Sequence, residues 1–375
     1  MSISVTTNSV QKNLEIISAK ELQDKELPQL NIIVQNILYQ GLTVLASQPK
    51  IGKSWLSLDI AVCVATGQPI WNNETLQGDV LYLALEDSFN RLQSRLNLIL
   101  NDMEAPNNLY LSIMSSSIST GLLEELNNFL ITHPNTKLII IDTLQKVRDT
   151  MKTTETAYGY DYKEVGALKK FADLHGISIL LVHHLRKARD KDDVFNQISG
   201  TNGIAGAADT MIVLSKPDRM QEETLFSITG RDVESYEQTI KFDKDTCHWT
   251  LLTTPEQLLE IRKNALYDND PVVITIKELL KEFPNGFEIS SSDLLDQIYK
   301  ITGITPKQKS PASLTKYIND LCYKLQQNDN IFYSPPNPNG GSKGRTLYFC
   351  SPNRSNENIE NTDENKTYDP ILGYQ

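Results

Sequence analysis

The stretch LTVLASQPKIGKSWLSLDIAVCVA, residues 42–65, decides the fold of the larger part of this 375-residue chain. It begins with an apolar run typical of a buried strand, passes through a loop that ends in Gly-Lys-Ser, and continues as a predicted amphipathic helix. This order is that of a phosphate-binding loop, in which backbone N–H groups at a helix N-terminus hold phosphate groups. Ser47 stands where the usual pattern has its first glycine, whereas Gly52, Lys53 and Ser54 follow the pattern.

The loop predicts a site for ATP and Mg²⁺. Lys53 is expected to reach the β and γ phosphates, and the hydroxyl of Ser54 to ligate the metal ion. The alternative, a chance Gly-Lys-Ser in an unrelated loop, is disfavoured by the strand and helix on either side. Nucleotide contacts are expected along the loop and the start of the helix, from Ser47, Gln48, Pro49, Lys50, Ile51, Gly52, Lys53, Ser54 and Trp55.

A second metal ligand is predicted at the end of KLIIIDT, residues 137–143. A magnesium ion bound to phosphate needs a carboxylate at the end of a neighbouring strand. Asp142 follows four apolar residues and lies about 90 residues after Lys53. Such a run is by itself most often an ordinary strand end, but after a phosphate loop it indicates the metal-binding aspartate.

Two carboxylates end the apolar run DVLYLALED, residues 79–87. Ligands of parallel sheets bind at the carboxyl ends of the strands, so Glu86 and Asp87 are both candidates to activate the water that attacks the γ phosphate. The run SILLVHH, residues 178–184, places His183 and His184 at a similar position. A histidine there can sense the γ phosphate or cap and pack the strand end.

The pattern between residues 38 and 255 indicates an α/β domain. Near-continuous runs of β-branched residues and leucine alternate with helical segments, as in parallel strands covered by helices on both faces. The segments 225–231 and 239–251 are expected to be edge strands. We predict a lead-in strap at 1–30, with a short helix from Ser18 to Leu22, then a RecA-like domain at 31–255 and a linker at 256–270.

A different pattern follows the linker. Three helices are predicted near 274–283, 293–301 and 313–325, with an N-cap within 290–293 for the second and at Ser310 for the third, and a β-hairpin with a Gly-rich loop follows them. This arrangement resembles a winged-helix domain, here 271–351, and the polar, acidic residues 352–375 are expected to be disordered. The helix 313–325 is the expected recognition helix, with Lys316 and Tyr317 exposed.

Charge limits the contacts that such a chain can make with DNA. The net charge is −11, so contact with a phosphate backbone must be local. Residues 300–350 hold seven Lys or Arg against two Asp, and Lys343 and Arg345 lie in the hairpin loop. A winged helix with this surplus can contact DNA, although such domains also serve protein contacts. The loop 186–200 has four basic residues against three Asp and barely favours DNA.

We expect a cytoplasmic protein without a membrane span. No apolar stretch approaches the length needed to cross a bilayer, and the N-terminus lacks the pattern of a signal peptide. The four cysteines form no CxxC pair, so neither a disulfide framework nor a zinc ribbon is indicated.

The motifs PKIGKSW, VLYLALEDSFNRLQSRL, LIIIDTLQKVR, SGTNGIAGAADTMIVL and ITGRDVES together resemble the RepA-like branch of RecA-type P-loop ATPases. That branch includes hexameric plasmid replicative helicases and AAA family ATPases of phages and mobile elements. The resemblance covers residues 30–255. It implies that Lys53, Glu86 rather than Asp87, Asp142 and His184 surround the nucleotide, and that Arg231 completes the site of a neighbouring subunit.

The resemblance implies an oligomeric ATPase, expected to be a hexameric ring, that acts on single-stranded or double-stranded DNA and resembles replicative helicases. In this family, loops corresponding to 186–200 face the central channel. Two other functions remain open: a recombination or repair ATPase that forms filaments on DNA, and a DNA-binding regulator in which ATP controls assembly and hydrolysis is incidental.

Overall fold

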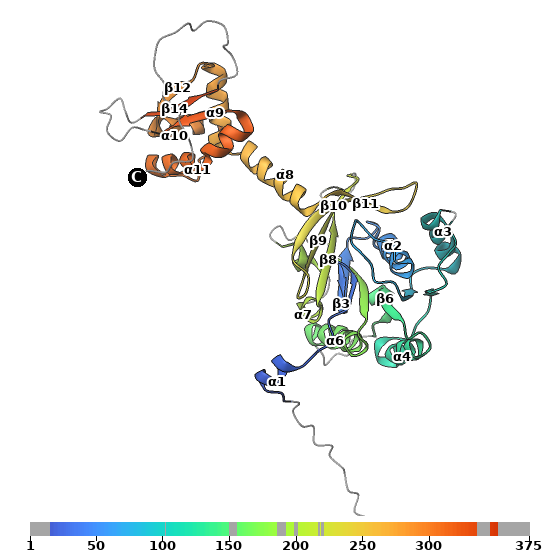
Figure 1. The fold of residues 1–375 in the computed structure, drawn as a ribbon. Helices are drawn as coiled ribbons and strands as arrows, with labels where there is room; N and C mark the ends of the chain where they lie inside the picture. The colour runs from blue at the N-terminus through green and yellow to red at the C-terminus, as the bar shows by residue number, and fades with distance from the viewer. Residues whose placement is uncertain are drawn as a thin grey trace, which may run out of the picture. The chain divides into compact units, whose positions relative to one another are not determined.

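The structure is a computed structural model that describes residues 16–101, 103–149, 156–185, 193–198, 202–216, 218, 221–335 and 346–351. The chain divides into two compact units, Met1–Leu258 and Leu259–Gln375 (Figure 1). Among the described residues, the four cysteines are free. No helix in these ranges has the length and apolar character needed to span a membrane.

A nine-stranded sheet forms the centre of the first unit, in the order β11-β10-β9-β8-β3-β7-β6-β4-β5. The strands from β8 to β5 in this order are parallel, and β9, β10 and β11 continue the sheet as antiparallel neighbours. Their bounds are β3 Gly41–Ser47, β4 Asp79–Ala84, β5 Leu109–Ser112, β6 Thr136–Asp142, β7 Ser178–His184, β8 Thr210–Ser215, β9 Glu223–Gly230, β10 Tyr236–Phe242 and β11 Trp249–Thr253. The predicted α/β fold with a mostly parallel sheet is confirmed.

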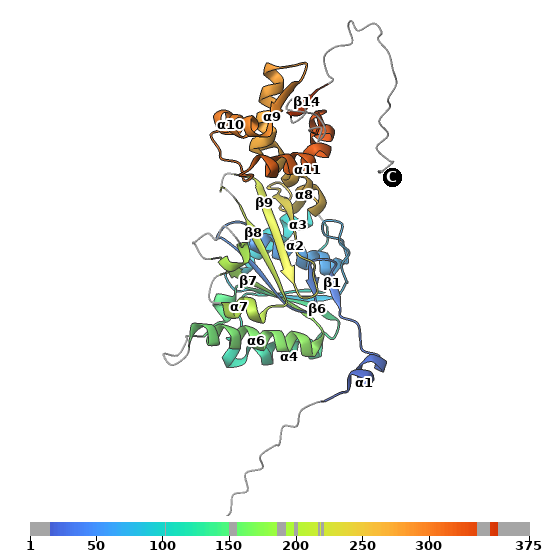
Figure 2. The same ribbon diagram turned by 90° about the vertical axis from the view of Figure 1, so that its left-hand side faces the viewer.

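Helices cover both faces of this sheet. Figure 2 shows α2 and α3 on one face and α4, α6 and α7 on the other. The near-continuous apolar strands follow from this arrangement, because a strand buried on both faces has no polar side: all seven residues of β3 are buried. The helices are α1 Ala19–Asp24, α2 Lys53–Thr66, α3 Phe89–Leu100, α4 Leu123–Thr132, α5 Leu144–Val147, α6 Ala157–His175 and α7 Asn202–Ala207, with a π-helical turn at Ile118–Leu122 and a 3₁₀ turn at Val194–Gln197.

One expectation about this unit needs correction, and one is confirmed. The segments assigned as edge strands are mostly interior, because β9 lies between β8 and β10, and β10 lies between β9 and β11. Most of the segment predicted as a linker, 256–270, forms the helix α8, Pro255–Asp268, which begins in the first unit and continues in the second. The short helix of the strap is present as α1, and the Ser18 side chain caps it by accepting a hydrogen bond from the backbone N–H of Glu21. A small hairpin, β1 Ile32–Val34 and β2 Leu38–Tyr39, leads into β3.

The second unit contains the three predicted helices and a three-stranded antiparallel sheet in the order β12-β14-β13. The N-cap predicted within 290–293 is Ser290, and Ser310 is the N-cap that the sequence predicts. The first strand of this sheet, which pairs with the last, was not predicted from the sequence. In chain order the elements are α9 Pro271–Glu282, β12 Phe287–Ser290, α10 Ser291–Thr302, α11 Pro311–Asp329, β13 Phe332–Ser334 and β14 Thr346–Cys350.

The expected exposure of Tyr317 on the recognition helix is wrong. Its side chain packs against the core of the second unit, and its hydroxyl donates a hydrogen bond to Asp270. The cause is helical spacing, because Tyr317 lies on the same face of α11 as the buried Leu314, Ile318 and Leu321. Lys316 is exposed as predicted. Lys343 and Arg345 lie outside the described residues.

Candidate nucleotide site

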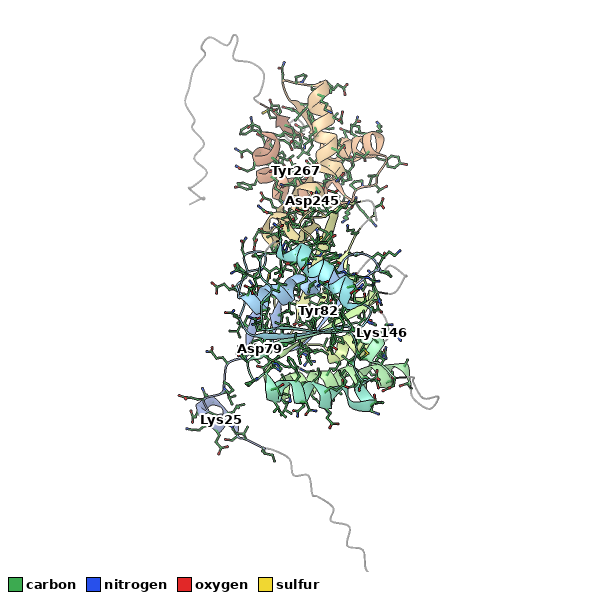
Figure 3. All side chains as sticks on the ribbon, turned by 90° about the vertical axis from the view of Figure 1, so that its right-hand side faces the viewer. Lys25, Asp79, Tyr82, Lys146, Asp245 and Tyr267 are labelled. Atoms are coloured by element: carbon green, nitrogen blue, oxygen red, sulfur yellow. The ribbon has the colours of Figure 1, made fainter. Side chains whose placement is uncertain are left out.

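The candidate site lies at the carboxyl edge of the parallel strands. Figure 3 labels Asp79 at the start of β4, Tyr82 within that strand, and Lys146 just after the end of β6. The phosphate loop follows β3 on this edge, and the strand pairs align the neighbouring ends: Ser47 lies opposite His184, and Ala84 lies opposite Asp142. Four adjacent strands, β3, β7, β6 and β4, therefore bring their last residues to one region.

The loop has a backbone that depends on Gly52. Its backbone φ is 110°, a value that residues with a Cβ rarely adopt. The helix α2 begins at the next residue. A Cβ at this position would lie 2.8 Å from Cζ2 of Trp249. The glycine therefore allows the tight turn that places a helix N-terminus behind the loop, and it allows the indole of Trp249 to pack against that turn.

The ammonium of Lys53 is buried among neutral oxygen atoms. Its Nζ donates to Oγ of Ser47 at 3.0 Å, to the Ser47 carbonyl at 3.1 Å and to the Gln48 carbonyl at 3.4 Å. Only 7% of the residue is exposed. Burial lowers the pKa of Lys53 to about 8, against the opposing effect of the Asp142 and Glu86 charges. Among the described residues no carboxylate forms an ion pair with this ammonium. An incoming phosphate would stabilise such a buried cation, so the residues present fit a bound nucleotide.

Ser47 has a role that its place in the motif did not predict. Its hydroxyl accepts from Lys53 and donates to the Gln48 carbonyl at 2.8 Å. The serine therefore adds a side-chain acceptor to the backbone carbonyl that a glycine at this position would also offer the lysine.

Asp142 and Ser54 lie where a magnesium ion would need them. Asp142 is 4% exposed, and a hydrogen bond joins its carboxylate to the Ser54 side chain. Burial raises the pKa of Asp142, while the hydrogen bonds from Ser54 and Tyr82 oppose that rise. The peptide bond between Asp142 and Thr143 is cis. Within the described ranges no cluster of three or more His, Cys, Asp or Glu could hold a metal ion, so a magnesium here would rely on Ser54, Asp142 and phosphate oxygens.

Tyr82 is a site residue that the sequence analysis missed. It is fully buried on β4, and its hydroxyl donates to Oδ2 of Asp142 at 2.9 Å. Burial, followed by the Asp142 charge, raises its pKa well above the usual value, so the hydroxyl remains a donor. The signal in the sequence was the single hydroxyl inside the apolar run before Glu86.

The two carboxylates after β4 have different surroundings. Asp87 forms ion pairs with Arg91 and Arg95 on α3, so its charge is already compensated. Glu86 is exposed, and its Oε1 accepts a 3.3 Å hydrogen bond from the hydroxyl of Thr143. Its charge also acts on Lys53 and Asp142, which places it beside the other site residues. Glu86 is therefore the carboxylate that remains free to act on a water molecule.

The histidine pair divides between the two faces of β7. Nδ1 of His184 lies 3.4 Å from Nζ of Lys53, whereas His183 points to the other face and is 4% exposed. Burial and the Lys53 charge lower the pKa of His184, which keeps the ring neutral at neutral pH. His184 is the member of the pair that meets the candidate site.

Arg231 lies where the parallel strands begin, at the end of the sheet opposite the phosphate loop. Gly230, the residue before it, pairs with Thr210 at the start of β8, and β8 runs parallel to β3. The guanidinium is 60% exposed and lies 3.5 Å from Asp209. Asp209 is held more closely by Lys169, at 2.6 Å. Arg231 therefore cannot serve the site of its own chain. The basic residues of the loop after β7, from Arg186 to Lys191, lie outside the described residues.

Part of the chain is similar to known proteins. Residues 11–190 match the family described as an AAA domain. No curated protein matches the sequence. Among solved structures, one isolated ATPase domain has 15% identity and a TM-score of 0.47, with 57% of this chain and 85% of that chain covered. A DnaB-like replicative helicase, solved in a study of its interactions with primase, has 14% identity and a TM-score of 0.47, with 57% of each chain covered.

Proposed function

We propose that this chain, which carries a P-loop ATPase domain matching the AAA domain family over residues 11–190, hydrolyses ATP as an oligomeric, helicase-like motor acting on DNA. The observation that carries the ATPase assignment is the buried ammonium of Lys53, which is surrounded by neutral acceptors and adjoins Ser54, Asp142 and Glu86. This is the arrangement that binding and hydrolysis of a nucleoside triphosphate require.

Each residue has a distinct part in the proposed reaction. The loop N–H groups and Lys53 bind the β and γ phosphates, and Ser54 and Asp142 hold Mg²⁺, which would neutralise charge on the phosphate oxygens. Tyr82 keeps the Asp142 carboxylate in place. Glu86, oriented by Thr143, accepts a proton from the attacking water. His184 contacts Lys53 directly, so a change at the γ phosphate can pass through the lysine to β7.

The position of Arg231 supports action between subunits. Its guanidinium is exposed and lies at the end of the sheet opposite the chain's own phosphate loop. It can therefore reach a nucleotide only if that nucleotide is bound to another subunit. Its weak hold on Asp209, which Lys169 already neutralises, leaves it available for a phosphate oxygen. A ring places such an edge of one subunit against the nucleotide of the next, and we propose a ring, hexameric as in the family that the sequence resembles.

DNA contact is proposed for the second unit. On α11, Lys316 and Lys324 are exposed together with Tyr323, of which 69% is accessible. A helix face with two ammonium groups and an exposed aromatic ring suits a phosphate backbone with an adjacent base or sugar. Asp320 lies between the two lysines along the helix, so the face is only moderately basic.

The test is the ATPase rate with and without single-stranded DNA at several protein concentrations. A DNA-dependent motor with a shared active site has a rate per subunit that rises with DNA and with protein concentration. Slow hydrolysis that single-stranded DNA does not change would overturn the motor and favour a nucleotide-gated DNA-binding regulator. Electron micrographs that show filaments on DNA in place of closed rings would favour the recombination or repair ATPase.

A further inference from the structure

A buried carboxylate fastens the turn between β10 and β11 to the helix that follows the phosphate loop. Asp59 on α2 is 3% exposed, and each of its two oxygens meets a residue of the hairpin. Oδ1 lies 2.8 Å from Nδ1 of His248, and Oδ2 accepts the backbone N–H of Trp249 at 3.3 Å. One side chain of α2 therefore holds two consecutive residues at the start of β11.

The ring of His248 faces an acceptor at each nitrogen. Nδ1 faces the Asp59 carboxylate, and Nε2 lies 3.0 Å from the carbonyl of Ile99 on α3. A carbonyl and a carboxylate only accept, whereas a neutral imidazole has a single N–H group to donate. The protonated ring can therefore serve both partners, and loss of its proton leaves one acceptor facing a lone pair. The side chain is 37% exposed, so it can exchange that proton with the solvent.

The surroundings of His248 favour the charged ring. The hydrogen bond with Asp59 raises its pKa above the usual value of about 6.5, burial opposes that rise, and the Asp59 and Asp243 charges add to it. Asp59 faces the ring from α2 and Asp243 from the hairpin itself, while α3 contributes the uncharged Ile99 carbonyl. The ring is therefore charged at pH 6, and it loses its charge as the pH rises through the raised pKa.

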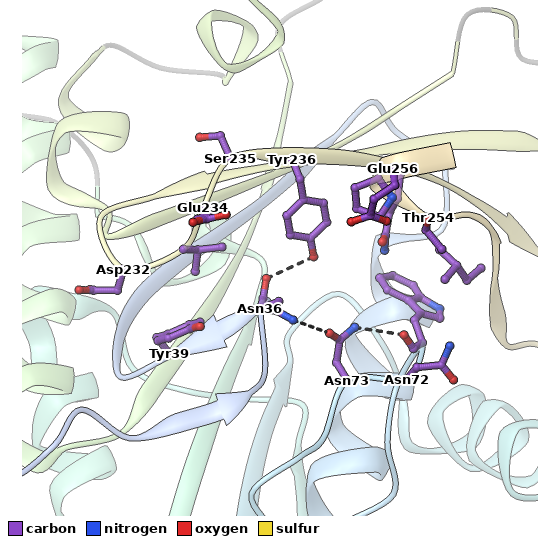
Figure 4. A pocket seen from close by; sticks show the side chains of 15 residues that line it. Asn36, Tyr39, Asn72, Asn73, Asp232, Glu234, Ser235, Tyr236, Thr254 and Glu256 are labelled. Atoms are coloured by element: carbon purple, nitrogen blue, oxygen red, sulfur yellow. Dashed lines mark hydrogen bonds between the residues drawn. The ribbon is translucent and has the colours of Figure 1, made fainter. Parts of the chain in front are cut away.

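Trp249 connects this arrangement to the phosphate loop. Its backbone is held on both sides, because its N–H donates to Asp59 and its carbonyl accepts from Nε1 of Trp71 at 2.6 Å. Trp71 belongs to residues 71–73, which form one wall of the pocket drawn in Figure 4. The indole of Trp249 is buried and packs against Gly52, where the loop turns into α2. The place of this ring beside the loop thus depends on the carboxylate that also holds His248.

We propose that Trp249 is a positioning residue for the phosphate loop and that protonated His248 keeps it in position. The inference rests on the proposed ATP site. Charged His248 holds the hairpin to α2 and α3, so the indole stays against Gly52 and the loop keeps the turn that presents its N–H groups to phosphate. A neutral ring gives up one of its two bonds. A smaller fraction of the molecules then has the loop ready to bind, and the apparent affinity for ATP falls by that fraction.

Calorimetric binding of a non-hydrolysable ATP analogue with Mg²⁺ to the full chain, at pH 6, 7, 8 and 9, tests the proposal. The variant is His248→Asn, whose amide can donate at the position of Nδ1 but stays neutral and leaves the Ile99 carbonyl without a donor. We expect it to bind the analogue about threefold to tenfold more weakly than the unaltered protein at pH 6, the scale of one lost hydrogen bond, and equally well at pH 9. Titration of Lys53 affects both proteins alike and cancels in the ratio of their affinities.

Two further variants identify the route of the effect. Trp249→Phe keeps an aromatic ring but lacks the indole atom that lies against Gly52. In this background His248→Asn is expected to change the affinity at pH 6 by less than about twofold, because the contact that transmits the effect is gone. His175→Asn, at the end of α6, is the matched control for loss of a histidine and should leave the affinity within about twofold of the unaltered protein at each pH.

The outcomes separate this proposal from the assignment of the ATP site. If the unaltered protein does not bind the analogue at any pH, the proposed function itself is wrong. If it binds, but the ratio to His248→Asn is the same at every pH, the proton on His248 does not position the loop. A lower thermal midpoint of His248→Asn with equal affinity at pH 6 would show that the bonds serve only the fold. An undiminished effect in the Trp249→Phe background would show that the charge acts on ATP through space, which contradicts positioning by Trp249.

Discussion

The hydroxyl of Tyr82 donates a 2.9 Å hydrogen bond to Oδ2 of Asp142, and this contact joins β4 to β6 beside the candidate nucleotide site. The two residues lie on adjacent parallel strands, and both are buried. The bond favours the ionised carboxylate, which is the form that can bind a magnesium ion. Tyr82 is thus a positioning residue whose effect should appear in metal binding and in pH dependence.

Tyr82→Phe removes this bond and leaves the ring. Because the bond opposes the rise in the pKa of Asp142, its loss raises that pKa further, and a protonated Asp142 does not ligate magnesium. We expect half-maximal ATPase activity to need about 3 to 10 times more Mg²⁺, and the acidic limb of the pH profile to move to higher pH. Magnesium titrations at pH 6 and pH 8 measure this. A loss of equal size at both values would contradict the mechanism.

Lys53→Ala removes the buried ammonium that the structure places against the start of the loop. ATP binding is expected to fall at least about 100-fold, since no other group replaces its contacts to the β and γ phosphates. Equilibrium binding of a fluorescent ATP analogue measures the change. Lys170→Ala, at an exposed position on α6, is the control for loss of one positive charge. Unchanged affinity in Lys53→Ala would disprove the phosphate-loop assignment.

The lowered pKa of Lys53 predicts proton uptake when ATP binds. Below a pH of about 8 the lysine of the free protein is charged, and above it the lysine is increasingly neutral. Bound phosphate favours the charged form, so ATP binding at pH 8.5 to 9 should take up protons and weaken as pH rises. Calorimetry in buffers with different ionisation enthalpies detects the uptake. Binding at pH 9 without uptake would place the pKa of Lys53 higher than about 8.

Glu86→Gln should retain ATP binding and slow hydrolysis by about 100-fold or more, the scale expected for loss of a general base. Asp87→Asn should instead disturb the ion pairs with Arg91 and Arg95, so its main effect is expected in thermal stability. Steady-state rates and melting curves of both variants decide between them. If Asp87→Asn is the slower enzyme, the catalytic carboxylate has been assigned to the wrong residue.

Arg231→Ala should bind ATP nearly normally and hydrolyse it poorly, because its guanidinium would act on the nucleotide of a neighbouring subunit. Mixing this variant with Lys53→Ala creates interfaces that combine an intact loop with an intact arginine. We expect partial recovery of ATPase activity in the mixture. No recovery, after subunit exchange has been demonstrated, would exclude this position and redirect the search to Arg186 or Lys187.

The sequence predicted best those elements whose pattern lies within one short stretch of the chain. The strand before the phosphate loop and the strand that ends at Asp142 are near-continuous apolar runs, as expected for strands buried on both faces, and the structure contains both strands. The adjacency of Lys53 and His184 depends on β7 lying next to β3, and no local pattern specifies which strands are neighbours.

Three features that the sequence did not predict all depend on contacts between distant segments of the chain. The segments 225–231 and 239–251 are expected to be edge strands, yet β9 and β10 are interior because β11 pairs beyond them. The strand β12 has four residues, and its partner β14 lies about 60 positions further along the chain. The role of Tyr82 depends on a partner on another strand. Contacts between distant segments, which set all three features, leave little trace in a single sequence.

Because Trp249 packs against Gly52, its intrinsic fluorescence is expected to be sensitive to the phosphate loop. Indole emission depends on the surroundings of the ring, and this ring packs against the residue where the loop turns into α2. The chain has two other tryptophans, Trp55 on the first turn of α2 and Trp71 between α2 and β4. A protein that retains Trp249 alone, with phenylalanine at the other two positions, therefore has a single emitting ring, and that ring lies against the loop. Its emission would report the arrival of a nucleotide at the phosphate loop without any attached label.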